Sequence, residues 1–167
     1  MIPASRQRNY LQSALYVIIV GTVAAVLLER LLTYAEAAEK VAMEITLSQL
    51  HSNLYTRVAL LALRGEHEAI DALASQSPFL TANASSPNYL GEFDGEATDA
   101  KGGQWFFDRA RNELVYVPKL KRYLTAGSGG QSVGALRFRL EVHKASNSGY
   151  TGVALRPTSA FEWVPFP

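Results

Sequence analysis

The longest apolar stretch of the chain runs from Tyr10 to Leu28, nineteen residues without a formal charge. A helix rises about 1.5 Å per residue, so this stretch matches the roughly 30 Å hydrocarbon core of a bilayer. Arg6 and Arg8 precede it, and the positive-inside bias then places the N-terminus in the cytoplasm. The pattern predicts a basic cytoplasmic tail over residues 1–9, a transmembrane helix over 10–28, and a larger outer part.

Two other interpretations of the stretch compete with this one. Ala35-Glu36-Ala37 has the small-x-small form of a signal-peptide cleavage site, but the apolar stretch is longer than the usual 7–15 residues, and Glu29-Arg30 separates it from that site. The other alternative is a buried core helix, yet few small domains enclose a helix that is apolar on all sides. A membrane anchor is the favoured interpretation.

The chain continues with a second, amphipathic pattern over residues 29–64. Six apolar residues follow spacings of 4, 3, 4, 4 and 3, which is one stripe of a helix; they are Met43, Leu47, Leu50, Leu54, Val58 and Leu61. Glu36 and Lys40 are four residues apart, in the favourable orientation for an ion pair. Gly65 stands where a C-terminal cap is expected. We expect one continuous helix from the membrane to Arg64, the alternative being a break near Glu29-Arg30.

Residues 65–167 form the outer globular domain of this scheme. Glu66–Gln76 is expected to be a short helix, and the Asn-, Gly- and Pro-rich segment Phe79–Gly103 a long loop. Trp105–Phe107 and Leu114–Val117 predict a hairpin with its turn near Asn112. Leu136–Val142 alternates apolar and charged residues, which is typical of a half-buried antiparallel strand. Tyr150–Arg156 is its expected partner.

The remaining segments complete the expected domain. Thr125–Gly134 is glycine-rich and predicts a crossing loop, Ala145–Gly149 a turn, and the aromatic tail Phe161–Pro167 a segment docked on the sheet. Together the patterns predict an α+β fold in which the long helix packs on an antiparallel sheet of about four strands. The expected core combines the helix stripe with strand residues; its members are Leu47, Leu50, Leu54, Val58, Leu61, Trp105, Phe107, Leu136, Phe138 and Leu140.

Charge and composition narrow the function classes. The formal net charge is +1 and there is no cysteine, which excludes disulfides and cysteine-based metal sites. Seven acids and no Lys or Arg lie between Glu66 and Asp99, whereas nine bases lie between Lys101 and Lys144. Such a split predicts either head-to-tail pairing of subunits or a domain that folds back on itself, with two solvated surfaces as the simpler alternative.

No convincing catalytic or metal site emerges from the motifs. The three histidines, His51, His67 and His143, do not share a ligand spacing. Gly130–Gly134 matches Gly-x-Ser-x-Gly, but it lacks the strand before and the helix after that a nucleophile elbow needs. We therefore expect no enzyme activity and no cofactor. The basic run Lys119, Lys121 and Arg122 is a weak candidate for contact with anionic lipid or nucleic acid, and a solvated edge is favoured.

Two segments carry a resemblance to a known family. Leu11–Ala25, an apolar run containing Ile18-Ile19-Val20-Gly21 and Ala24-Ala25, resembles the N-terminal segment of type IV pilins and type II secretion pseudopilins. Gly103–Asp108 followed by Asn112–Tyr116 is similar to the Trp-x-Tyr…Leu-Val-Tyr hairpin of pseudopilin-like proteins. The resemblance implies a long helix carrying a small sheet, anchored in the bacterial inner membrane with the sheet domain periplasmic, or extracellular within a filament.

The chain also departs from that family. Aligned on Gly21, Gln12 stands where the family generally has a glutamate, and Gln7 where its leader peptidase expects glycine. The resemblance therefore implies a divergent accessory or minor subunit that acts by protein contacts. Its partners would be other pilin-like subunits or assembly-platform proteins, in a hetero- or homo-oligomer. Small residues on the membrane helix are the expected packing site; with Gln12 they are Gly21, Thr22, Ala24 and Ala25.

A different class of function also fits the sequence. A single-pass anchored ligand-binding or sensory module would place a pocket within Phe79–Gly103 and a helix break at the membrane surface.

Overall fold

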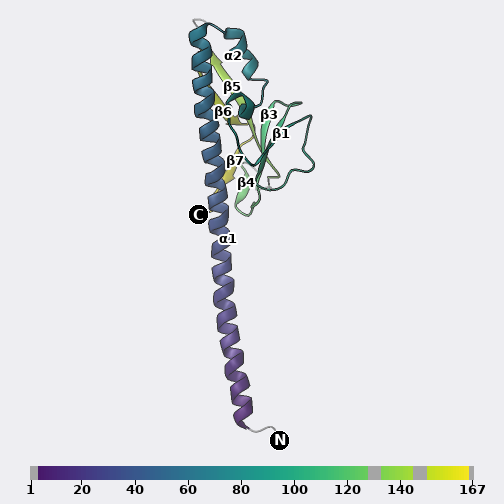
Figure 1. Cartoon of the computed structure of the whole chain (residues 1–167). Helices are drawn as coiled ribbons and strands as arrows, with labels where there is room; N and C mark the ends of the chain where they lie inside the picture. Colours follow the sequence, from purple (N-terminus) through teal and green to yellow (C-terminus); the bar gives the residue numbers. More distant parts are fainter. Residues whose placement is uncertain (1–3, 128–132, 145–149, 166–167) are drawn as a thin grey trace.

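A computed structural model describes residues 4–127, 133–144 and 150–165 of the chain. One helix, α1 (Ala4–Arg64), forms a rod that carries the rest of the chain along its C-terminal half (Figure 1). It runs without a break through Glu29-Arg30. Gly65, with φ 74°, ends it: Gly65 N–H bonds to Ala62 O and Glu66 N–H to Leu61 O, at 3.1 and 3.0 Å. These two bonds form a Schellman cap, which satisfies carbonyls that the helix leaves open.

The rest of the chain forms a head of two short helices and two sheets. The helices are α2 (His67–Leu73) and α3 (Pro78–Thr81). The strands are β1 (Tyr89–Phe93), β2 (Gln104–Asp108), β3 (Glu113–Val117), β4 (Leu124–Ala126), β5 (Leu136–Lys144), β6 (Tyr150–Pro157) and β7 (Phe161–Trp163). The main sheet has the order β1-β2-β3-β5-β6, and β4 pairs with β7 separately. The α+β fold with a long helix on a C-terminal sheet is confirmed.

The hairpin β2–β3 is antiparallel and joins through Asn112, whose φ of 53° lies in the left-handed region. Trp105 pairs with Tyr116, and β3 continues the sheet to β5 through Leu114 opposite Phe138. Asparagine tolerates that backbone conformation better than most residues, which is why the turn falls there. The expected hairpin and the expected β5–β6 pair are both present.

The segment Phe79–Gly103 differs from the long loop that its composition indicates. It contains part of α3 and the strand β1, which lies parallel to β2, so the main sheet has five strands and is mixed rather than purely antiparallel. Tertiary contacts hold β1 in place: Tyr89 stacks on Phe79 at 4.4 Å between ring centroids, and the Tyr89 hydroxyl lies 2.6 Å from Ser77 Oγ. Neither contact has a signature in the local sequence pattern.

One stripe of α1 is buried under the head. Leu54 is fully buried and Leu50, Val58 and Leu61 nearly so, whereas Leu47 is half-buried. Met43 and Leu50 share a cluster with residues of β2, β3 and β5, among them Trp105, Phe107, Leu136 and Phe138. Leu54, Val58 and Leu61 share a second cluster with Leu140 and Val153. The sheet thus covers the predicted stripe, since burying both apolar faces together removes them from water.

The described part of the aromatic tail docks on the main sheet as expected, where Phe161 packs edge-to-face on Phe138 of β5 with ring centroids 6.2 Å apart. Its strand β7 pairs with β4 in a sheet of its own, with Leu124 opposite Trp163, rather than joining the main sheet. Trp163 is buried in the first cluster, between the rod and the head. Phe166, Pro167, the expected turn Ala145–Gly149, and Gly130 to Ser132 of the Gly-x-Ser-x-Gly match lie outside the described residues.

Candidate functional surface: the two faces of the long helix

The N-terminal part of α1 is the candidate membrane segment. Within the described residues, α1 is the one helix long and apolar enough to cross a bilayer. Every described residue from Gln12 to Leu32 is exposed, and none of the apolar window is buried in the chain. The chain's own core is therefore not what covers this segment. The side chains of Arg6 and Arg8, on which the topology argument rests, lie outside the described part.

The structure places four of the five predicted packing residues together. Gly21, Thr22, Ala24 and Ala25 lie within about one turn of α1 and are exposed. Gln12 is nine positions before Gly21, which puts it about half a turn away around the helix. The Thr22 hydroxyl donates to Ile18 O at 2.8 Å, so its hydrogen bond is made within the helix. These small side chains, with the hydrogen bond of Thr22 already made, form a surface that another helix can approach closely.

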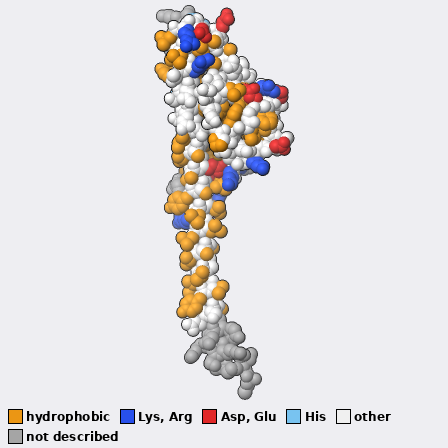
Figure 2. Space-filling view, viewed as in Figure 1, with side chains coloured by type: hydrophobic (Ala, Val, Ile, Leu, Met, Phe, Trp, Pro, Cys, Tyr) orange, Lys and Arg blue, Asp and Glu red, His pale blue; other side chains and the backbone are white. Residues whose placement is uncertain are grey.

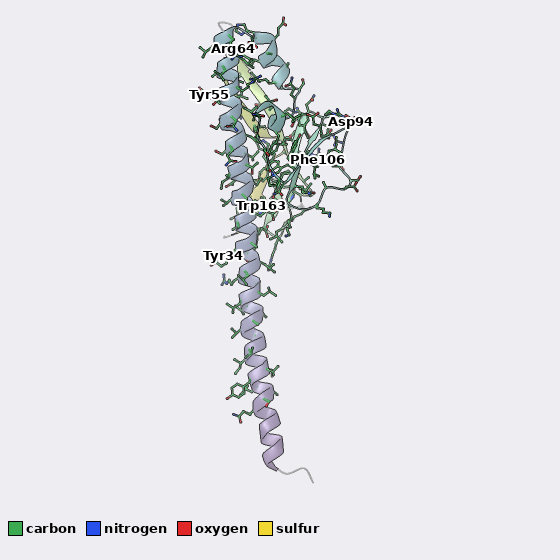
Figure 3. The ribbon with its side chains drawn as sticks, viewed as in Figure 1. Tyr34, Tyr55, Arg64, Asp94, Phe106 and Trp163 are labelled. Atoms are coloured by element: carbon green, nitrogen blue, oxygen red, sulfur yellow. The ribbon has the colours of Figure 1, made fainter. Side chains whose placement is uncertain are left out.

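A second apolar stripe of α1 faces away from the head. Its residues lie on one helix face at spacings of 3, 7, 4 and 10 residues, and the exposed Ser48 and Ser52 lie on the same face within the last interval. The apolar residues are exposed by 63, 61, 50, 51 and 56%, in the order Leu31, Tyr34, Val41, Ile45 and Tyr55. We call these five residues the outer stripe. Tyr34 and Tyr55 project from the side of the rod opposite the head (Figure 3), and apolar side chains continue down the rod into the membrane segment (Figure 2).

Three carboxylates on α1 join the rod to the head. Glu36, 2% exposed, accepts from Tyr123 N–H and from Trp163 Nε1–H, both at 2.9 Å. Glu39 accepts from the Tyr116 hydroxyl and from Leu120 N–H, each at 2.9 Å, and from Lys119 N–H. Glu29 pairs with Arg122 at 3.1 Å. Charge-assisted bonds of this kind are stronger than neutral ones, so they fix the segment between β3 and β4 against α1.

Sequence reasoning did not find this role. Glu36 was expected to pair with Lys40, but Lys40 pairs with Glu44 at 3.7 Å and Glu36 turns toward the head. The donors lie 87 and 127 residues along the chain from Glu36, so no local spacing signals them. Glu36 instead sits beside the buried stripe, on the face that the head covers. An acid on that face is the only sequence hint, because a buried carboxylate requires hydrogen-bond donors.

Two tyrosines have raised pKa values: Tyr116, which is bonded to Glu39, and Tyr89, which is bonded to Ser77. The pKa of Tyr116 is raised above its ordinary value, first by burial and then by its hydrogen bond to the Glu39 carboxylate. Burial likewise raises the pKa of Tyr89, although its hydrogen bond with Ser77 acts in the opposite direction. Both phenols are therefore neutral donors or acceptors at neutral pH. Their role is structural, since each bridges segments that are distant in sequence.

Part of the uneven charge distribution is balanced by ion pairs within the head. Asp94 pairs with Arg109 at 2.9 Å, and Glu96 with Arg137 at 2.8 Å. The Arg137 guanidinium also lies 3.6 Å from Asp108 and 3.5 Å from Glu113, both of which are buried. Asp94 and Glu96, two of the seven acids between Glu66 and Asp99, thus pair with arginines of the basic segment, as the fold-back alternative expects.

The described residues give no support for a metal site. No group of three or more His, Cys, Asp or Glu side chains in them is arranged to hold a metal ion. His51 Nε2 lies 2.8 Å from Val153 O and joins α1 to β6. A hollow of about 450 Å³ lies over the outer face of the main sheet, against Phe106, Val115 and Arg137, and is bordered by Glu96 and Ala97.

The chain matches no family model, and no curated protein or solved structure shows detectable similarity to it. The main structural indication of function is therefore α1, which is buried under the head on one face and exposes an apolar stripe on the other.

Proposed function

We propose that the protein is a non-enzymatic, membrane-anchored subunit of a type IV pilus or type II secretion apparatus, most simply an accessory or minor one. It acts by packing its rod against other pilin-like subunits or assembly-platform proteins. Its anchor lies in the inner membrane, with the N-terminus cytoplasmic and the head periplasmic, or extracellular once in a filament.

The observation that carries this proposal is the outer stripe. A helix exposed on one face normally carries polar residues there, yet α1 presents Val41 and Ile45, each about half exposed, opposite the buried Met43 and Leu50. The stripe continues the apolar surface of the membrane segment, as Figure 2 shows. An exposed apolar surface of this extent is typical of an interaction site. A neighbouring helix that lies along α1 would cover both the outer stripe and the apolar surface of the membrane segment.

The contacts of Glu36 support retention of the anchor. Cleavage after Ala37 would remove Glu36 from the head and leave the buried Trp163 indole N–H and Tyr123 N–H without their acceptor. Unpaired buried donors are destabilising by about 1–3 kcal/mol each. Gln12, in place of the family's glutamate, supports an accessory role, because an amide lacks the charge that would enforce pairing with a neighbouring amine.

Photo-cross-linking in native membranes tests the proposal. A photoreactive residue replaces Val41 or Tyr55 on the outer stripe, and a matched probe replaces Asp94, which is exposed on the far side of the head (Figure 3). We expect Val41 and Tyr55 to cross-link to proteins that themselves carry an apolar N-terminal helix, and Asp94 not to. Equal yields from all three positions, or none from the stripe, would overturn the proposal.

An anchored ligand-binding module is the second candidate. The hollow over Phe106 and Val115 favours it, because Glu96 and Ala97 of the segment expected to hold a pocket border that hollow. The same candidate predicts a helix break at the membrane surface, and α1 is continuous there. Native mass spectrometry of the detergent-extracted protein would decide: a retained small molecule that is lost in Val115→Trp favours this candidate.

A further inference from the structure

We propose that the membrane-proximal edge of the head docks on anionic phospholipid headgroups through Lys119, Lys121 and Arg122, together with Arg30 of α1. We call these four residues the basic edge. The inference rests on the proposed membrane anchor and names anionic phospholipid as a further binding partner of the protein. Figure 2 shows Lys and Arg side chains at the lower border of the head, where it meets the rod.

The height of the basic edge above the bilayer follows from contacts with α1. Glu29 is the first charged residue after the apolar run, and Arg122 NH2 lies 3.1 Å from its carboxylate. The next residue, Tyr123, has its hydroxyl 3.4 Å from Thr33 Oγ1. A bilayer is about 5–8 Å thicker on each side than its hydrocarbon core, which covers the first four or five residues after Leu28. Arg122 and Arg30 are therefore at headgroup height.

Lys119 is placed somewhat higher. Its N–H contacts Glu39, which is ten residues beyond Glu29 and so about 15 Å further along the rod. That leaves roughly 8–12 Å to the headgroup layer, about one to one and a half Debye lengths at physiological ionic strength. Lys119 is exposed, and a lysine side chain reaches several ångströms toward the surface by snorkelling. Its charge therefore still acts on anionic lipid.

Two of the acids near this edge are turned toward the head, and a third is paired. Glu36 is buried and Glu39 accepts three hydrogen bonds from the head, so their oxygens point inward. Glu29 and Arg122 neutralise each other, and Glu162 on β7 remains as an exposed acid that offsets one further base, so the excess charge comes from Lys119, Lys121 and Arg30. Lys121 Nζ donates to the neutral carbonyl of Gly134 at 2.9 Å, which leaves its charge uncompensated. The basic edge thus presents cations on its outer side.

The basic edge is also held rigidly. Glu39 fixes the backbone of Lys119 and Leu120, and these bonds use N–H groups rather than the lysine side chain. Gly102 lies beneath the same turn, where an added Cβ would stand 2.6 Å from Lys119 Cα. A pre-formed surface loses little conformational freedom on binding, which favours contact with headgroups. A juxtamembrane base near anionic lipid typically contributes roughly a fivefold gain in binding.

The test uses the full chain in vesicles that contain trace spin-labelled phosphatidylglycerol or phosphatidylcholine. Electron paramagnetic resonance measures how strongly each lipid associates with the protein. We expect the wild-type chain to favour phosphatidylglycerol, and K119Q/K121Q to lower that preference by about threefold to fivefold. The matched control R57Q/R64Q removes the same charge from the exposed far end of the rod and is expected to leave the preference unchanged. High salt is expected to abolish the preference, since it shortens the Debye length to about 3 Å.

Three outcomes overturn the inference: a wild-type chain that associates equally with both lipids, a control as impaired as K119Q/K121Q, or lysine-dependent binding of duplex DNA without lipid preference. K119Q alone, which keeps the Lys121–Gly134 bond, guards against misfolding and is expected to show about half the effect on a logarithmic scale. Lipid preference without cross-links from the outer stripe leaves the headgroup contact standing and rejects the subunit role. A chain that fails to enter either bilayer rejects both.

Discussion

Glu36 on α1 accepts a hydrogen bond from the indole Nε1–H of Trp163, at 2.9 Å, between residues 127 positions apart. The same carboxylate oxygen accepts from Tyr123 N–H. Both partners lie at the border of the head nearest the membrane segment, where β4 and β7 meet the rod (Figure 1). A single buried acid thus ties β7 and the β3–β4 connection to α1.

Glu36→Ala tests this tie. The substitution leaves two donors without an acceptor, so we expect the free energy of unfolding to fall by about 2–4 kcal/mol. The measurement is denaturant unfolding of the detergent-solubilised chain, followed by tryptophan fluorescence. Glu44→Ala is the matched control, because Glu44 is on the same helix with a half-exposed side chain, and should change stability by less than about 0.5 kcal/mol. A Glu36→Ala chain as stable as the control would contradict the assignment.

The raised pKa of Tyr116 predicts that the free energy of unfolding decreases at alkaline pH. Its pKa is raised in the folded chain from an ordinary value of 10.0, so the folded phenol stays protonated where the unfolded one ionises. The stabilisation is therefore complete below about pH 10 and is lost progressively as the pH rises above that value.

The experiment compares Tyr116→Phe with the wild-type chain across that range. The variant loses its bond to Glu39 and should be less stable at neutral pH by about 1.5–3 kcal/mol. It should also lose less stability than the wild-type chain between about pH 9 and pH 11, because one linked group is gone. Unfolding midpoints at several pH values measure both effects, and parallel pH profiles for the two chains would refute the linkage.

Leu54 and Tyr55 are neighbours on α1, but Leu54 packs against the head and Tyr55 lies on the outer stripe. Substituting each in turn therefore tests the two faces of the helix separately. Leu54 is fully buried, whereas Tyr55 is 56% exposed on the outer stripe. Leu54→Ala should lower the free energy of unfolding by about 2–5 kcal/mol through the cavity it leaves. Tyr55→Ala should change the stability of the isolated chain by less than about 0.5 kcal/mol. A large loss in Tyr55→Ala, measured by thermal unfolding in detergent, would show that the outer stripe packs within the chain.

Arg137 is expected to be the most sensitive base in the head. It lies among Glu96, Asp108 and Glu113, two of which are buried, so Arg137→Met removes the cation that the two buried carboxylates share. Asp108 keeps its contact with Arg111, and Glu113 keeps its contact with Arg139. Removing the whole partner of a buried charge is destabilising by about 3–5 kcal/mol, and the remaining contacts with Arg111 and Arg139 lower the expected loss to about 2–3 kcal/mol. Arg156→Met removes an exposed pair with Glu141 and should have an effect below about 1 kcal/mol. Similar unfolding midpoints for the two variants would contradict this ranking.

The sequence by itself determined the rod and the strongest strands. A run of nineteen uncharged residues, an apolar stripe at helical spacing and a glycine after Arg64 are local patterns, and α1 follows them from Ala4 to its cap. The alternation in β5 and the turn at Asn112 are local in the same sense. Local patterns predict structure well because the hydrogen bonds of a helix or a tight hairpin join residues close together in the chain.

The tertiary structure alone decided which distant groups meet. β1 forms because Tyr89 packs on Phe79 and its backbone pairs with β2, although Gly91 and the neighbouring Ser-Pro-Asn residues indicate a loop. Glu36 and Lys40 have the spacing of an ion pair, yet the buried donors of Trp163 and Tyr123 bind Glu36 instead. A donor left unpaired inside the protein is more costly than an exposed helical ion pair is favourable. This difference in free energy depends on burial and not on sequence spacing. The partners of Glu36 were therefore decided by the tertiary structure and not by the local sequence pattern.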